Sequence, residues 1–189
     1  MIYLSIDVEA SGPFPGTHSL VSVGAAPVVR GEAGWQVDRD RTFYVELRPL
    51  EGAAELPDAT AVHGLTRDHL EAHGLEPEAA MRKLAAYLAT LGPFKTAAWP
   101  VSFDHPFVGW YLQRFLGENP LGHSGFDIAS YAMGLFSATA RGPALRAMEA
   151  AGYRPPANPH PHHALHDAIE QGETLVWLLE HAERRRLPR

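Results

Sequence analysis

Polar and apolar residues alternate at the start of the chain. In residues 2–8, Ser5 and Asp7 lie between apolar neighbours in a segment rich in strand-forming residues, which predicts a central β-strand. Two glycines and two prolines in residues 12–16 predict a loop after it. Two further apolar runs, residues 20–29 and 42–47, are separated by a polar, glycine-containing stretch. This arrangement predicts an antiparallel meander of three strands.

Helical spacing appears later in the chain. Residues 78–91 carry apolar side chains at the spacing of a helix, which Gly92 and Pro93 end, and the short run 94–99 predicts a fourth strand. Four prolines at residues 152–161 predict another loop. Further helices are expected at residues 107–115, 144–151 and 164–183. Strands followed by helices, with one strand between helices and no repeat or linker, predict a single α/β domain.

Length, composition and charge limit the possible classes of protein. A chain of 189 residues, with 46% hydrophobic and 20% charged residues, is expected to form one compact domain. No apolar run reaches the length of a membrane span, the first residues do not form a secretory signal, and there are no cysteines, so we expect a cytoplasmic protein. The net charge of −6 argues at first sight against a nucleic-acid partner, because phosphate binding normally uses Lys and Arg.

The first candidate site is the pair Asp7 and Glu9. Residues two apart in a strand point to the same face. Two adjacent carboxylates repel each other unless a cation lies between them, and such oxygen-rich sites suit Mg²⁺ or Mn²⁺. The alternative is a pair of solvated acids at the end of a strand.

Two later segments add further acids. Asp104 lies near the start of a predicted helix, where an acid is also favoured simply by capping and by the helix dipole. Four histidines and Asp167 occur in residues 160–167. In one ideal helix, His162 and Asp167 would lie on different faces, so they can converge only if His162 belongs to the preceding loop, as Pro159 and Pro161 suggest. The alternative is an exposed histidine-rich turn that binds metals only adventitiously.

Together these motifs resemble the DnaQ-like, DEDDh-type family of 3′–5′ exonucleases. Asp7 and Glu9 match its first motif, Asp104 its second, and His162 with Asp167 its third. Residues 61–66, Ala-Val-His-Gly-Leu-Thr, are similar to the family's His-Gly-Ile-Thr segment. The resemblance extends from Tyr3 to about Leu179. In one departure, Trp99-Pro100 stand where the family often has an Asn-containing pair, so local substrate contacts are expected to differ.

The resemblance implies a fold and a domain. The fold would be RNase H-like, with a mixed five-stranded sheet whose first three strands are antiparallel, flanked by helices; residues 126–129 are the candidate fifth strand. The chain would be a single exonuclease domain over residues 1–189, with its core at about 2–183 and a basic tail at 184–189. A homodimer is compatible with the family.

The resemblance also implies a chemistry. Asp7, Glu9, Asp104 and Asp167 would hold two divalent cations, Mg²⁺ or Mn²⁺, with Asp7 as the bridging ligand, and His162 would be the general base. The substrate would be the 3′ end of DNA or RNA, and the product a nucleoside 5′-monophosphate. The expected substrate-binding residues are Ala10, Ser11, Gly12, His63 and Phe103.

Two other functions remain open from the sequence. The first is a zinc hydrolase using the histidine cluster at residues 160–166, although no His-Glu-x-x-His helix is present. The second is a nucleic-acid-binding module without turnover. Asp127 is expected to be a structural or supporting acid, and the three arginines at 184–186 to be a solvated helix end.

The exonuclease hypothesis changes the meaning of the net charge. If four of the 22 acidic residues are metal ligands, two bound divalent cations bring the total from −6 to −2. The carboxylates would then become the device that binds phosphate, and nucleic-acid binding should depend on metal.

Overall fold

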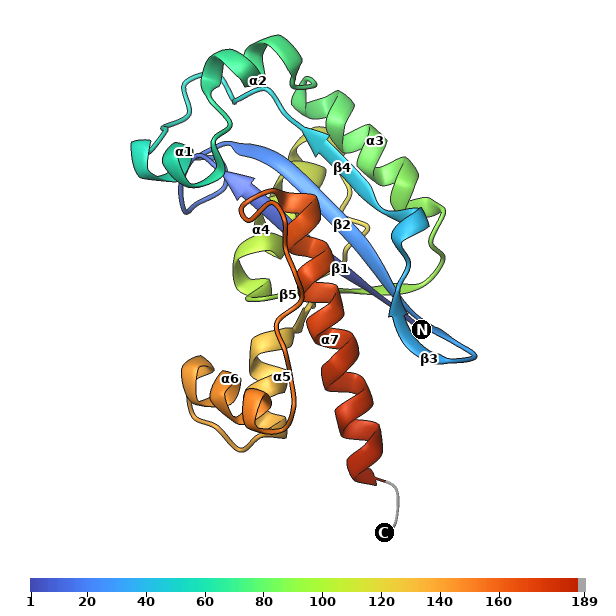
Figure 1. Cartoon of the computed structure of the whole chain (residues 1–189). Helices are drawn as coiled ribbons and strands as arrows, with labels where there is room; N and C mark the ends of the chain where they lie inside the picture. The colour runs from blue at the N-terminus through green and yellow to red at the C-terminus, as the bar shows by residue number, and fades with distance from the viewer. Residues whose placement is uncertain (187–189) are drawn as a thin grey trace.

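The computed structural model describes residues 1–186, which form a mixed β-sheet with helices on both sides (Figure 1). The strands are β1 (Ile2–Ala10), β2 (Leu20–Gly31), β3 (Gly34–Val37), β4 (Phe43–Glu46), β5 (Phe94–Ala98) and β6 (Phe126–Asp127). The helices are α1 (Pro57–His63), α2 (Arg67–His73), α3 (Pro77–Ala89), α4 (Val101–Leu116), α5 (Ile128–Leu135), α6 (Arg141–Ala150) and α7 (Ala164–Arg186), with a 3-10 turn at Arg39–Arg41. None of the helices in this range has the length and apolar character of a membrane span.

The sheet combines an antiparallel and a parallel half. Its strands lie in the order β3-β2-β1-β5-β6, and β4 also pairs with β2. β2 is antiparallel to β1, β3 and β4, whereas β5 runs parallel to β1, and β6 runs parallel to β5. The expected mixed α/β sheet, with its antiparallel strands first, is therefore confirmed.

The sheet has six strands rather than the expected five. The additional strand is β3, which folds back on the end of β2 as a hairpin and pairs Val28 with Val37. This strand has only four residues and follows a polar, glycine-containing stretch, so the apolar pattern indicated a loop there. The candidate strand at 126–129 is reduced to two residues, because Asp127 caps α5 by accepting the Ser130 N–H at 2.6 Å.

Three helices that the apolar pattern did not predict are short. Neither α1 nor α2 exceeds seven residues, and α5 has eight. Among the residues of α1 none is buried, and α2 buries only Leu70. Helices with so little apolar contact leave no amphipathic stripe in the sequence.

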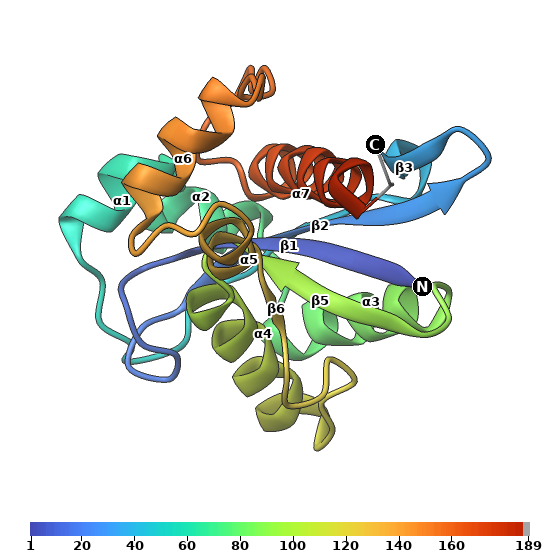
Figure 2. The ribbon, with the colours of Figure 1, turned by 90° about the horizontal axis from the view of Figure 1, so that it is seen from below.

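Two hydrophobic cores lie on opposite faces of the sheet. Figure 2 shows α7 on one face and α3 with α4 on the other. Even-numbered residues of β1, such as Leu4 and Ile6, pack into the core formed with α3 and α4, where burial of a side chain such as Phe107 contributes roughly 1.5–3 kcal/mol. Odd-numbered residues of β1 point to the other face because side chains alternate along a strand. Asp7 and Glu9 therefore face α7.

Two glycines let α7 lie close to the sheet. A Cβ at Gly24 would be 2.2 Å from the backbone of Ala164, the first residue of α7. Gly24 is also the cross-strand partner of Asp7, so the start of α7 rests directly beside this acid. Further along α7, a Cβ at Gly172 would be 3.5 Å from Ser5, which shows that α7 runs antiparallel to β1.

Two arginines near the end of α7 contact other residues of the protein. Arg184 lies 3.5 Å from Glu180, and Arg185 donates to the Leu135 carbonyl at 2.7 Å. The helix extends past the expected end at residue 183. Residues 187–189 of the expected basic tail lie outside the described part of the chain.

Candidate active site

Asp7 and Glu9 occupy the carboxyl end of the central strand β1. Their side chains share the face of the sheet that α7 covers, and only 9% of Glu9 is exposed. The next strand, β5, runs parallel to β1 but pairs with it only as far as Ser5. The acids therefore lie where the neighbouring strand has ended, at an edge of the sheet that α4 and α7 can reach.

Asp104 reaches this edge from α4. The helix begins at Val101, three residues after β5 ends, so Asp104 lies in its first turn, as expected. Its Oδ1 accepts the Val8 backbone N–H at 3.0 Å, and the side chain is 3% exposed. The Val8 N–H lies beyond the part of β1 that pairs with β5, so it is satisfied by Asp104 instead. Because Val8 lies between Asp7 and Glu9 in the sequence, this hydrogen bond holds the Asp104 carboxylate close to both acids.

His162 and Asp167 meet because His162 precedes α7. His162 has a φ of +62°, in the left-handed region, and its backbone N–H donates to Asp167 Oδ2 at 3.0 Å. The other oxygen of Asp167 accepts Asn158 Nδ2 at 2.5 Å. The loop is thus closed onto the first turns of α7, and the prediction that His162 lies outside the helix is confirmed.

The ligand atoms of three residues converge. One oxygen or nitrogen from each of Glu9, His162 and Asp167 lies within 4.8 Å of the other two. Within residues 1–186 this is the one set of three or more metal-binding side chains at such distances. These residues come from a strand, a loop and a helix, so only the folded chain brings them together.

Burial and mutual repulsion raise the pKa values of carboxylates in the site. Burial raises the pKa of Asp7 well above its usual value, and the nearby charges of Asp104, Glu9 and Asp167 raise it further. Burial and the charges of Asp167 and Asp104 raise the pKa of Glu9 to about 8, and burial raises the pKa of Asp104 to about 7. Hydrogen bonds to Asp7 and Asp104 act in the opposite direction without cancelling this effect.

The donor set fits divalent cations. No ion pair in the described chain joins a Lys or Arg to any of these four carboxylates. Carboxylates that are crowded together and raise one another's pKa values form the oxygen-rich donor set that Mg²⁺ or Mn²⁺ prefers.

Gln171 is a member of the site that the motifs did not reveal. Its Nε2 donates to Asp7 Oδ1 at 2.5 Å, and its Oε1 accepts the Trp99 backbone N–H at 2.8 Å. Gln171 lies four residues after Asp167, on the same face of α7. That spacing was the available signal, but an uncharged side chain outside a motif gave no reason to select it.

The expected substrate-binding residues surround the end of β1. The backbone N–H and C=O of Ser11 bond to Ser19 and Leu56 within the chain, and Gly12 is packed against His18. Phe103 precedes Asp104 and packs on Phe107, with ring centroids 5.1 Å apart.

His63 lies beside Ala10. Its Nδ1 accepts the Leu65 N–H at 3.0 Å, which leaves the proton on Nε2. This Nε2 is buried and has no hydrogen-bond partner within the described chain. Burial lowers the pKa of His63, and both the Ala10 backbone and His162 are near enough to influence it. A substrate role for His63, like that of the other four residues, stays a prediction.

The remaining histidines of the cluster pack against one another. His163 stacks on Tyr44 at 4.3 Å, and His166 lies edge-on to His160 and His163, with ring centroids 4.8 and 4.9 Å apart. No metal-ligand set among the described residues includes these three rings. Of the histidines in the zinc-hydrolase alternative, only His162 belongs to a converging set of ligand atoms within residues 1–186, the one with Glu9 and Asp167.

Asp127 has the structural role expected of it. It accepts the Val101 N–H at 2.8 Å as well as the Ser130 N–H, and so joins the starts of α4 and α5. Partial burial opposes ionisation, but the hydrogen bonds hold the pKa of Asp127 below its usual value.

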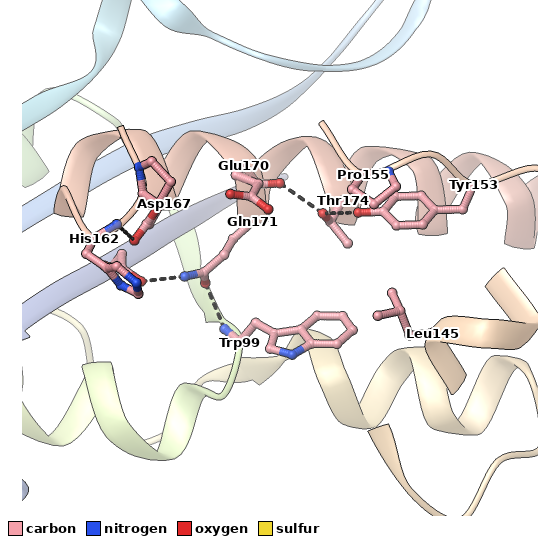
Figure 3. A pocket seen from close by; sticks show the side chains of 11 residues that line it. Trp99, Leu145, Tyr153, Pro155, His162, Asp167, Glu170, Gln171 and Thr174 are labelled. Atoms are coloured by element: carbon pink, nitrogen blue, oxygen red, sulfur yellow. Dashed lines mark hydrogen bonds between the residues drawn. The ribbon is translucent and has the colours of Figure 1, made fainter. Parts of the chain in front are cut away.

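A cleft of about 540 Å³ opens beside the carboxylates. Figure 3 shows His162, Asp167 and Gln171 at one end, with Trp99, Tyr153 and Leu145 toward the other. The Thr174 hydroxyl forms a hydrogen bond with the Tyr153 hydroxyl at 2.8 Å and donates another to the Glu170 carbonyl at 2.9 Å. The cleft follows α7 from the acidic centre toward α6.

Comparison with known proteins bears on the chemistry of this site. A family model described as Exonuclease (RNase_T) matches residues 4–175. The chain is 31% identical over 192 residues to the 3′-5′ DNA exonuclease Cap18 of Escherichia coli, covering 100% of this chain and 97% of Cap18.

Solved structures show the same fold at low sequence identity. Cell-death related nuclease 4 superposes with a TM-score of 0.73 at 11% identity, over 95% of this chain and 64% of that protein. The nuclease domain of 3′hExo, a DEDDh family member bound to rAMP, has a TM-score of 0.71 at 15% identity, over 95% of this chain and 92% of that domain.

Proposed function

We propose, from the premise that this chain belongs to the Exonuclease (RNase_T) family and is a 3′–5′ exonuclease, that it shortens DNA from the 3′ end with two divalent cations and releases nucleoside 5′-monophosphates. The observation that carries the proposal is the convergence of Glu9, His162 and Asp167 within 4.8 Å, with Asp7 and Asp104 close enough to interact with these acids. No ion pair in the described chain joins a Lys or Arg to the four carboxylates. Family membership makes dependence on divalent metal the expected chemistry.

Asp7, Glu9, Asp104 and Asp167 would hold the cations, which we propose to be Mg²⁺ or Mn²⁺. Once bound, two such ions would neutralise the scissile phosphate, lower the pKa of the attacking water and stabilise the leaving oxygen. Asp7 lies on β1, the central strand of the sheet, and the charges of all three other acids raise its pKa, which supports its assignment as the shared ligand.

His162 is the proposed general base. Its ring borders the cleft and lies beside Glu9 and Asp167, so it can take a proton from water held at the acids. The backbone hydrogen bond from His162 to Asp167 keeps the loop in register with α7. The ring is exposed, so it can exchange that proton with solvent.

DNA is the proposed substrate because Cap18, to which the chain is similar over its whole length, is a 3′-5′ DNA exonuclease. The terminal nucleotide would lie against Ala10, Ser11 and Gly12, next to His63 and Phe103. His63 lies beside the Ala10 backbone, which supports a place for it next to the terminal nucleotide.

The test is digestion of matched single-stranded DNA and RNA that carry a label on the 3′-terminal nucleotide. We expect release of labelled monophosphate from DNA with Mg²⁺ or Mn²⁺, and none with EDTA. Asp167→Asn should abolish release, whereas Asp127→Asn, which removes an acid outside the site, should keep it if the protein folds. Release that persists in EDTA, or full activity of Asp167→Asn, would overturn the metal assignment.

A further inference from the structure

The cleft beside the acids continues well past the residues needed for metal binding. Asp7, His162 and Asp167 line one end, and Trp99, Leu145 and Tyr153 line the rest. Its volume of about 540 Å³ lies in the range of ordinary small-ligand sites. The reaction centre occupies only the end shown at His162 in Figure 3.

The direction of the cleft is set by α7. Because α7 runs antiparallel to β1, Thr174 lies on the side of Asp7 that leads toward the start of β1. The segment Ala10–Gly12 lies on the other side of Asp7, beyond the end of β1. A phosphodiester held at the acids would therefore have the proposed site of the terminal nucleotide on one side and the cleft on the other.

The far part of the cleft has walls suited to a nucleobase. Trp99 is partly buried against the core, and no hydrogen bond among the described residues uses its indole N–H. Leu145 on α6 is 37% exposed. Tyr153, by contrast, is buried, and its hydroxyl is held by Thr174. An aromatic face beside an exposed aliphatic side chain can accept any base, because every base has a π-face.

We propose that this cleft binds the nucleotide on the 5′ side of the bond that is cut, with its base against Trp99 and Leu145. The subsite rests on the proposed function, since it needs the scissile phosphate at the acids. The proposed function places the terminal nucleotide on one side of the acids. The subsite gives a place to the nucleotide before it, which must lie on the opposite side.

The experiment compares two substrates that share the terminal nucleotide. One is a thymidine oligonucleotide, and the other is thymidine 5′-(p-nitrophenyl phosphate), in which nitrophenolate replaces the upstream strand as leaving group. Trp99→Ala and Leu145→Glu should each raise KM for the oligonucleotide by roughly 5- to 100-fold, the value of one stacked base. Their kcat/KM for the ester should fall less than for the oligonucleotide, because the ester carries only a nitrophenyl ring on that side of the bond.

Matched variants separate binding from stability. Leu75→Glu is the control for Leu145→Glu, because Leu75 is equally exposed at 37% and lies on the α2–α3 connection, which Figure 1 shows at the other end of the molecule from α6. Trp99→Tyr keeps an aromatic face and should restore most of the oligonucleotide affinity.

The outcomes are distinct. An unchanged KM for the oligonucleotide in both Trp99→Ala and Leu145→Glu overturns the subsite, as does an equal loss on both substrates that Trp99→Tyr does not rescue. If the wild-type protein with Mg²⁺ or Mn²⁺ hydrolyses neither substrate, the proposed function itself fails, and the subsite with it.

Discussion

Gln171 holds Asp7 in place by donating from Nε2 to Asp7 Oδ1 at 2.5 Å, while its Oε1 accepts the Trp99 N–H. This side chain connects the central acid of the site to the backbone between β5 and α4. Oδ2 of Asp7 makes no hydrogen bond within the described residues and is left for a cation. Partners of this kind orient a metal ligand and are part of the metal site.

We therefore expect Gln171→Ala to weaken metal binding by roughly 10- to 100-fold without removing a ligand. The measurement is the Mg²⁺ or Mn²⁺ concentration that gives half-maximal nucleotide release. Gln113→Ala, at an exposed position on α4, is the control and should leave this concentration unchanged. If Gln171→Ala needs no more metal than the wild type, Gln171 does not position Asp7.

His162→Ala should lower kcat by roughly 10²- to 10⁴-fold, because proton transfer from water loses its acceptor. His160 lies in the same loop, is exposed and makes a ring contact only with His166. The variant His160→Ala should therefore retain most of the activity. The measurement is kcat at saturating metal and oligonucleotide. A decrease of less than about threefold in His162→Ala would exclude it as the base.

The acids predict a pH dependence of the metal-free protein. The pKa of Glu9 in the folded state is about 8, above its usual 4.5, so the folded state holds a proton that the unfolded state has lost between these values. Stability from this group is therefore present at low pH and decreases as the pH rises toward 8. Asp104, with a pKa of about 7, acts in the same direction.

Thermal unfolding in EDTA at pH 5.5 and 8.5 measures this effect. Glu9→Gln should match the wild-type Tm at pH 5.5, where Glu9 is protonated, and exceed it at pH 8.5. Excess Mg²⁺ should stabilise the wild type most at pH 8.5, because the ion competes with fewer protons. A Tm difference between variant and wild type that does not change with pH would contradict the assigned electrostatics.

Gly24→Ala should disturb the placement of α7. The added Cβ would meet the Ala164 backbone at 2.2 Å, which cannot move aside as a flexible side chain could. We expect a loss of about 1–3 kcal/mol in the free energy of unfolding. Activity should fall further than stability alone explains, since Asp167 moves with the start of α7.

Gly134→Ala provides a control of opposite sign. Gly134 lies in α5 with open space around it, so alanine there should stabilise the helix by roughly 0.5–1 kcal/mol. Urea unfolding of both variants gives the comparison. If Gly24→Ala were as stable and active as Gly134→Ala, the close approach of α7 to β2 would not be needed.

The elements that could be predicted from the sequence are those with a strong apolar pattern. β1 and β2 are long runs of mostly buried residues, and α3 and α7 carry apolar side chains at helical spacing, so the pattern located all four to within a few residues. The short strand β3 and the helices α1 and α2 were missed, because they bury too little apolar surface to leave a periodic signal. The helix α5 was missed because it has only eight residues and its apolar start was assigned to the expected strand at 126–129.

The candidate site divides in a similar way. Charged ligands in recognisable spacings, such as Asp7 with Glu9, could be identified before the fold was known. Gln171 and Asn158 could not, because an amide acquires its role only from the carboxylate that the fold places beside it. The same holds for the cleft, whose walls come from the end of β5, α6 and α7.

The central claim is that the acids hold divalent cations and remove single nucleotides from a DNA 3′ end. The most direct measurement is mass spectrometry of the small products, alongside gel analysis of 5′-labelled single-stranded DNA, with Mn²⁺ or Mg²⁺ and with EDTA. The account predicts nucleoside 5′-monophosphates and a ladder of strands shortened one nucleotide at a time, only when metal is present. Nucleoside 3′-monophosphates, internal fragments or equal digestion in EDTA would contradict it.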